Sequence, residues 1–191
     1  MTPPMQISEW KQFYGLEGAA AATLMGLLFV AVALNSDLIL AGGRSHTKMR
    51  AEQAFQNYIA VLFVALMELL PHMPVNVLSV SLLTQSVVMI VYAAYRLLKT
   101  EKESVIPFNR RHHWRRMISS MLGYGLMIYG SRQVLHQDPE SGFYLVGCGT
   151  ILLLISATIS SWELLIRVAE IRYNMSKTEP PTPSAVVSEK P

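Results

Sequence analysis

The hydrophobic positions of this chain occur in long runs rather than in the one-sided patterns of a soluble domain. Five segments contain no Asp, Glu, Lys or Arg and together hold 92 of the 191 residues: Gly18–Ser36, Gln53–Met67, Val75–Tyr95, Met117–Ser131 and Ser141–Trp162. A helix on the surface of a soluble domain needs polar residues along its outer stripe, and these segments have almost none. The pattern therefore predicts helices that cross a membrane.

A helix needs about 20 residues to cross the hydrocarbon core of a bilayer. The runs lack the alternation of barrel strands and are too long for them. We therefore predict an all-α membrane protein, a bundle of five transmembrane helices within 14–174, with spans at about 15–36, 52–70, 75–96, 117–135 and 141–163. The last helix is expected to extend into the cytoplasm.

The ends of the chain are expected to lie outside this bundle. Residues 1–13 are predicted to form an interfacial segment, with Trp10 as part of an aromatic anchor and without the basic region of a cleavable signal peptide. Residues 175–191 are rich in Lys, Glu, Ser, Thr and Pro, which predicts a disordered tail. Between the second and third spans, Pro71 and Pro74 predict a tight turn because proline cannot continue a helix.

The basic residues predict the orientation of the helices. Lys and Arg number 14 on one side of the predicted spans and 2 on the other. Because cytoplasmic loops carry the excess of Lys and Arg, the N-terminus should lie outside and the C-terminus in the cytoplasm. Four arginines flank Trp114 on the cytoplasmic side and are expected to contact anionic lipid headgroups: Arg110, Arg111, Arg115 and Arg116. A metal or nucleic-acid role for this stretch, which includes His112 and His113, is the weaker alternative.

Composition narrows the chemistry further. Only 15% of the residues are charged, the net charge is +3, and the lone cysteine cannot form an intrachain disulfide or a cysteine-based zinc site. The common metalloprotease, phosphate-loop, nucleophile-elbow and redox motifs do not occur in the chain. We therefore expect no enzyme activity, no cofactor, no metal site and no nucleic-acid partner.

Small residues mark the faces where helices can approach closely in a bilayer. Gly18, Ala22 and Gly26 follow each other at a spacing of four in the first span. Gly123 in the fourth span and Gly149 in the fifth belong to similar series. These stripes either close the bundle or form an interface with another protein or a second copy of the chain, and the sequence leaves both alternatives open.

Polar residues within the spans are costly and form the candidate intramembrane site. Gln85 lies in the middle of the third span, where it is expected to make an interhelical hydrogen bond, as Gln56 and Asn57 are in the second. Glu17, Glu68 and Arg132 lie at similar depth near the outer ends of three spans. They either extend to the interface or pair inside the bundle, and pairing would create a proton- or cation-responsive site.

The N-terminal segment also carries a resemblance. Trp10, Phe13 and Tyr14 are followed by the small-residue run 18–22 and by Gly-Leu-Leu-Phe-Val-Ala at 26–31. This pattern resembles small bacterial polytopic integral membrane proteins of unassigned function. The resemblance implies a multi-pass protein of the bacterial inner membrane and does not imply an activity.

Two functions are compatible with these observations. The preferred hypothesis is a non-enzymatic accessory, scaffold or modulator that acts through helix packing and its cytoplasmic segments. The alternative is a small oligomeric channel or transporter for an ion or small solute, suggested by the polar residues of the candidate intramembrane site. No two halves of the chain resemble each other as inverted transporter repeats do.

Overall fold

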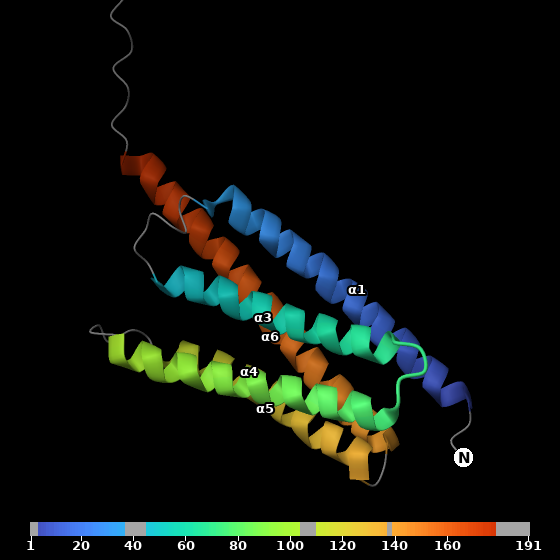
Figure 1. The fold of residues 1–191 in the computed structure, drawn as a ribbon. Helices are drawn as coiled ribbons and strands as arrows, with labels where there is room; N and C mark the ends of the chain where they lie inside the picture. The colour runs from blue at the N-terminus through green and yellow to red at the C-terminus, as the bar shows by residue number, and fades with distance from the viewer. Residues whose placement is uncertain (1–3, 37–44, 104–109, 137–138, 179–191) are drawn as a thin grey trace, which may run out of the picture.

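The computed structural model describes residues 4–36, 45–103, 110–136 and 139–178. In these ranges the chain is all-α and forms five helices: α1 (Pro4–Leu34), α3 (Ser45–Leu69), α4 (Val75–Glu103), α5 (Arg110–His136) and α6 (Pro139–Thr178). Successive helices run in opposite directions, so the chain passes back and forth along one axis (Figure 1).

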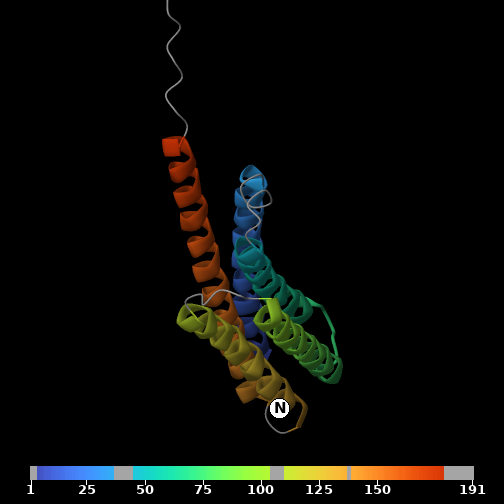
Figure 2. The same cartoon turned by 90° about the vertical axis from the view of Figure 1, so that its left-hand side faces the viewer.

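The helices lie where the sequence predicts them, but they are longer than the predicted spans. Helix α1 begins at Pro4, so most of the predicted interfacial segment 1–13 is the first part of this helix. Helix α6 continues to Thr178, so the first residues of the predicted disordered tail are helical and residues 179–191 lie outside the described residues. Figures 1 and 2 show the C-terminal end of α6 extending past the start of α3 and the end of α4.

Three of the described helices are long and apolar enough to cross a membrane, over Trp10–Leu34, Val75–Tyr95 and Pro139–Asn174. Helices α3 and α5 are more polar, since α3 carries charged residues near both ends and α5 begins with an arginine-rich stretch. Composition alone therefore identifies fewer candidate spans than the five that the charge pattern predicts.

Helices α3 and α6 occupy the middle of the structure. Helix α1 packs mainly on α3 and also touches α6, whereas α5 packs along α6. Helix α4 packs on α5 and has only a slight contact with α3. This arrangement buries the residues that α1, α3 and α6 direct toward one another and leaves α4 at the edge (Figure 2).

The buried face of α1 follows a seven-residue repeat. Tyr14, Ala21 and Leu28 are buried at a spacing of seven, the spacing that keeps one seam of a helix facing a neighbour. On the same face, a Cβ added to Gly18 would lie 2.6 Å from the Cβ of Ala65 in α3. Gly18 therefore confirms the prediction that α1 approaches another helix closely.

Two pairs of glycines bring α5 and α6 into direct backbone contact. A Cβ added to Gly149 would lie 2.8 Å from the carbonyl oxygen of Gly123, and a Cβ added to Gly123 would lie 3.1 Å from that of Gly149. Gly130 and Gly142 repeat this relation, since a Cβ on either would lie 2.9 Å from the other's carbonyl oxygen. Seven residues separate the two glycines on each helix, so one antiparallel seam contains both pairs.

The predicted turn between Pro71 and Pro74 is present. Helix α3 ends at Leu69, α4 begins at Val75, and His72 between them has a φ of 59°. This left-handed conformation is uncommon outside glycine, and it reverses the chain within a few residues.

Candidate functional site

Glu17 is the most deeply buried carboxyl group among the described residues. It lies on α1 facing α6 and is only 6% exposed. Its Oε2 is 2.9 Å from the hydroxyl of Thr150, whereas its Oε1 is buried and has no hydrogen-bond partner within the described structure. The expectation that Glu17 extends to the membrane interface is therefore wrong, because the side chain is enclosed between two helices.

Tyr14 and Glu68 complete this group. The hydroxyl of Tyr14 donates a 3.1 Å hydrogen bond to the carbonyl oxygen of Phe143 in α6 and lies within electrostatic range of both glutamates. Glu68 comes from α3, and its Oε1 is buried without a hydrogen-bond partner among the described residues. We call Tyr14, Glu17, Glu68 and Thr150 the acidic cluster. It joins α1, α3 and α6.

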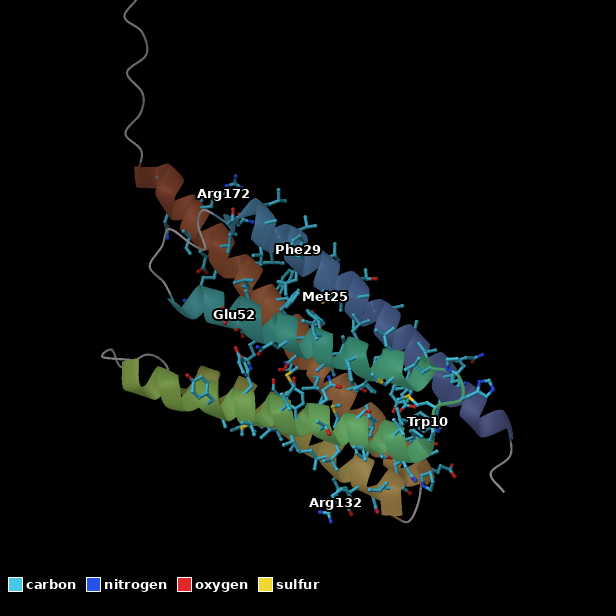
Figure 3. The ribbon with its side chains drawn as sticks, in the orientation of Figure 1. Trp10, Met25, Phe29, Glu52, Arg132 and Arg172 are labelled. Atoms are coloured by element: carbon cyan, nitrogen blue, oxygen red, sulfur yellow. The ribbon has the colours of Figure 1, made fainter. Side chains whose placement is uncertain are left out.

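Arg132 does not belong to the acidic cluster, so the hypothesis of an ion pair inside the bundle is wrong. Its side chain is exposed and points away from the other helices (Figure 3). Helix α5, which carries it, packs on α4 and α6 rather than on α1. Arg132 lies toward the same end of the structure as Trp10 (Figure 3), but the sequence does not specify which face of α5 it occupies.

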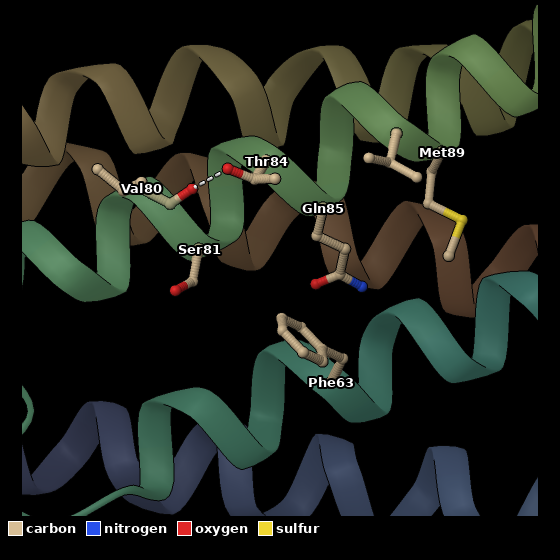
Figure 4. A pocket seen from close by; sticks show the side chains of 7 residues that line it. Phe63, Val80, Ser81, Thr84, Gln85 and Met89 are labelled. Carbon is tan, nitrogen blue, oxygen red and sulfur yellow. Dashed lines mark hydrogen bonds between the residues drawn. The ribbon is translucent and has the colours of Figure 1, made fainter.

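Gln85 makes the interhelical hydrogen bond that the sequence predicts. Its Nε2 donates to the carbonyl oxygen of Ala60 in α3 at 3.2 Å, and its Oε1 is buried without a partner in the described part of the chain. The side chain lines a groove of about 400 Å³ between α3 and α4. Gln85 and Ser81 extend from α4 toward Phe63 of α3 across this groove (Figure 4).

Asn57 forms the centre of a second buried polar group. Its Nδ2 donates to the hydroxyl of Ser120 at 2.9 Å, and its Oδ1 accepts a 3.1 Å hydrogen bond from Tyr124. The hydroxyl of Ser120 is also 3.2 Å from that of Ser156. The group links α3, α5 and α6 deep in the bundle. The prediction of an interhelical hydrogen bond by Asn57 is confirmed.

The small-residue stripe of α1 divides between two faces of the helix. Gly18 is buried against α3, but Ala22 and Gly26 are exposed, and a Cβ added to Gly26 would meet no atom within 4 Å. The interpretation that all three close the bundle is therefore wrong. Residues at a spacing of four move gradually around the helix relative to the seven-residue repeat of the buried face. The later residues of the stripe therefore no longer face α3.

The remaining predicted site residues lie in the first turns of α5. Arg110, Arg111, Arg115 and Arg116 belong to this helix, but their side chains are outside the described part of the structure. Within the described residues, no three His, Cys, Asp or Glu side chains are grouped so that they could hold a metal ion.

The sequence pattern does not identify Tyr14 and Thr150 as partners of Glu17. Tyr14 directly follows the predicted interfacial segment, and Thr150 is one of six Ser and Thr residues inside the longest charge-free run. The available signal was the seven-residue repeat through Tyr14, which predicts that this ring faces a neighbouring helix. Trp10 and Phe13 likewise lie beside Gly147 of α6, 3.6 and 3.2 Å from its added Cβ.

No protein-family model, no curated protein and no solved structure matches this chain.

Proposed function

We propose that the chain is a multi-pass protein of the bacterial inner membrane whose five helices all cross the bilayer. The three apolar helices, the alternating helix directions and the excess of Lys and Arg on one side support this arrangement. Trp10 and Arg132 then lie at the outer end, and Glu52 and Arg172 lie at the cytoplasmic end (Figure 3). The N-terminal resemblance supports the bacterial location, and the arginines at the start of α5 are proposed to bind anionic lipids.

Reporter fusions test this topology. Fusions after Arg50, Lys102 and Lys177 should report a cytoplasmic location, and a fusion within 138–141 should report the outside, because four of the five helices separate it from the N-terminus. The measurement is the activity of a paired alkaline phosphatase and fluorescent-protein reporter at each site. A cytoplasmic signal from the fusion within 138–141 would contradict the proposal of five spans.

Within the membrane, the chain is proposed to act as a non-enzymatic accessory protein that packs against another membrane protein. The observation that carries this proposal is the outward face of α1, where Ala19, Ala22 and Gly26 are exposed. Lipid supplies no hydrophobic drive between helices, so close helix contacts depend on small residues. The glycine pairs of α5 and α6 are already used within the chain, whereas this face of α1 is open to a helix from outside.

Gly26→Leu should abolish the association without damaging the fold. A Cβ at this position meets no atom within 4 Å, whereas a leucine side chain prevents close approach of a second helix. The measurement is mass and composition after affinity purification in mild detergent, combined with thermal denaturation. Gly125→Leu is the matched control, because a Cβ at Gly125 also meets nothing within 4 Å. A Gly26→Leu variant that retains its bound proteins would contradict the proposal.

A second candidate function is favoured by the acidic cluster. Ionisable side chains inside membrane helices commonly mark the paths of ions or protons, and Glu17 and Glu68 both direct an unpartnered oxygen into the bundle. The corresponding function is a small oligomeric channel or transporter for an ion or small solute. Two results would favour transport over the accessory role. The purified protein would form a homo-oligomer without a second protein, and it would carry a flux across liposomes that Glu17→Gln reduces.

A further inference from the structure

The contacts of Thr150 determine which atom holds a hydrogen in the acidic cluster. Its hydroxyl is 2.9 Å from Oε2 of Glu17 and also 2.9 Å from the carbonyl oxygen of Gly147 in its own helix. A threonine hydroxyl has a single hydrogen and can donate fully to one acceptor. If that hydrogen goes to Gly147, the short contact with Glu17 requires a hydrogen on the carboxyl group.

Other hydroxyls in the bundle show the direction that the hydrogen takes. Ser and Thr side chains within helices commonly donate to a carbonyl three or four residues earlier. Eight others among the described residues do so: Thr23, Ser79, Thr84, Ser86, Ser131, Thr158, Ser160 and Ser161. Such a hydroxyl keeps its lone pairs free to accept from a neighbouring helix.

Thr158, on the same helix as Thr150, shows this combination of one donated and one accepted hydrogen bond. Its hydroxyl donates to the carbonyl oxygen of Leu154 at 2.8 Å and accepts a 3.3 Å hydrogen bond from the hydroxyl of Tyr58 in α3. Thr150 has the same arrangement, with Gly147 as its acceptor and Glu17 in the place of the tyrosine. By this comparison Glu17 is the donor.

We propose that Glu17 is a proton-binding site, and that its protonated carboxyl group donates to Thr150 and holds α1 against α6. The inference goes beyond the accessory role and stands whether or not the chain carries a solute. A neutral acid also suits the location, since an ionised carboxylate this deeply buried needs a cation or several donors to offset the loss of water. Within the described structure, Oε1 of Glu17 has neither.

Glu17 and its neighbour Tyr14 on α1 face groups from α3 and α6. Thr150 of α6 contacts Glu17, and Tyr14 lies within electrostatic range of Glu17, of Glu68 in α3 and of Cys148 in α6. None of these four side chains is a base that carries positive charge. Ionisation of Glu17 would therefore place a buried negative charge where none of these groups offsets it, and it would favour a state in which α1 separates from α6 and water reaches the carboxylate.

Infrared spectroscopy of the full-length protein in mild detergent tests the proton directly. A protonated carboxyl group has a C=O stretching band that is distinct from the bands of a carboxylate. The wild-type band assigned to Glu17 should disappear in Glu17→Gln, and it should shift in Thr150→Val because the acceptor is lost. Glu170→Gln, at an exposed carboxyl group of α6 outside the acidic cluster, is the control and should leave the Glu17 band unchanged. A spectrum that is identical in the wild type and Glu17→Gln would overturn the proposal.

Thermal stability as a function of pH provides the second readout. Because the closed state holds one proton more than the separated state, the equilibrium between them should shift toward separation by up to about tenfold for each unit of rising pH. Glu17→Gln should remove this dependence of stability on pH, since the glutamine amide still donates to Thr150 and does not titrate. An unchanged pH profile in Glu17→Gln would contradict the proposal even if that variant were less stable overall.

Discussion

Gly149→Leu should destabilise the folded chain by about 3 kcal/mol, the upper part of the range for overpacked cores. The added side chain would begin 2.8 Å from the carbonyl oxygen of Gly123 and 2.8 Å from Cγ of Met127. The first of these atoms belongs to the backbone of α5, so a change of side-chain rotamer cannot relieve the clash. The two helices must move apart. The measurement is the free energy of unfolding of the full chain in mixed detergent micelles.

Gly125→Leu is the control for this substitution. Gly125 lies two residues from Gly123 on the same helix, and a Cβ at this position meets no atom within 4 Å. Leucine favours helix over glycine by roughly 0.5–1 kcal/mol, so this variant should be as stable as the wild type or slightly more stable. Equal losses in both variants would show that the glycine seam does not hold α5 on α6.

The sequence predicted the helices well because their signal is local. Charge-free runs, a proline turn and flanking basic residues each lie within a few residues of the feature that they indicate. The helix ends were predicted less well. The predicted extension of the last helix past residue 163 is present. Residues 4–13 and 175–178 were predicted to lie outside the bundle, yet they continue α1 and α6, because an existing helix extends at little further cost.

The candidate site was harder to predict, because it depends on which face each residue occupies. Glu17, Glu68 and Arg132 have similar depth along the bundle, and depth follows from position in a span. Their rotation about the helix axis follows from packing. Arg132 is turned outward, whereas Glu17 meets Thr150 across 133 positions of sequence. The seven-residue repeat through Tyr14 and Ala21 indicates which face of α1 is buried. The spacing of four through Ala22 and Gly26 suggests a different face.

Asn57→Ala should destabilise the chain by about 1–2 kcal/mol. The change removes two interhelical hydrogen bonds, each worth about 0.6 kcal/mol on average in membrane proteins. It also leaves the buried hydroxyl of Tyr124 without its acceptor, and unsatisfied buried groups carry a further cost. Gln56→Ala is the matched control, since Gln56 is the neighbouring amide, is only partly buried and lies outside this polar group. Its loss should stay within about 0.5 kcal/mol.

Tyr124→Phe in the Asn57→Ala background distinguishes the hydrogen bonds from simple loss of volume. The Tyr124 hydroxyl lies 3.1 Å from Oδ1 of Asn57, so each single variant leaves one buried polar atom unpaired. The double variant removes both members of that pair, and it should be more stable than the sum of the single losses predicts, by about 0.5 kcal/mol or more. Strictly additive losses would mean that the hydrogen bond between Tyr124 and Asn57 does not stabilise the chain.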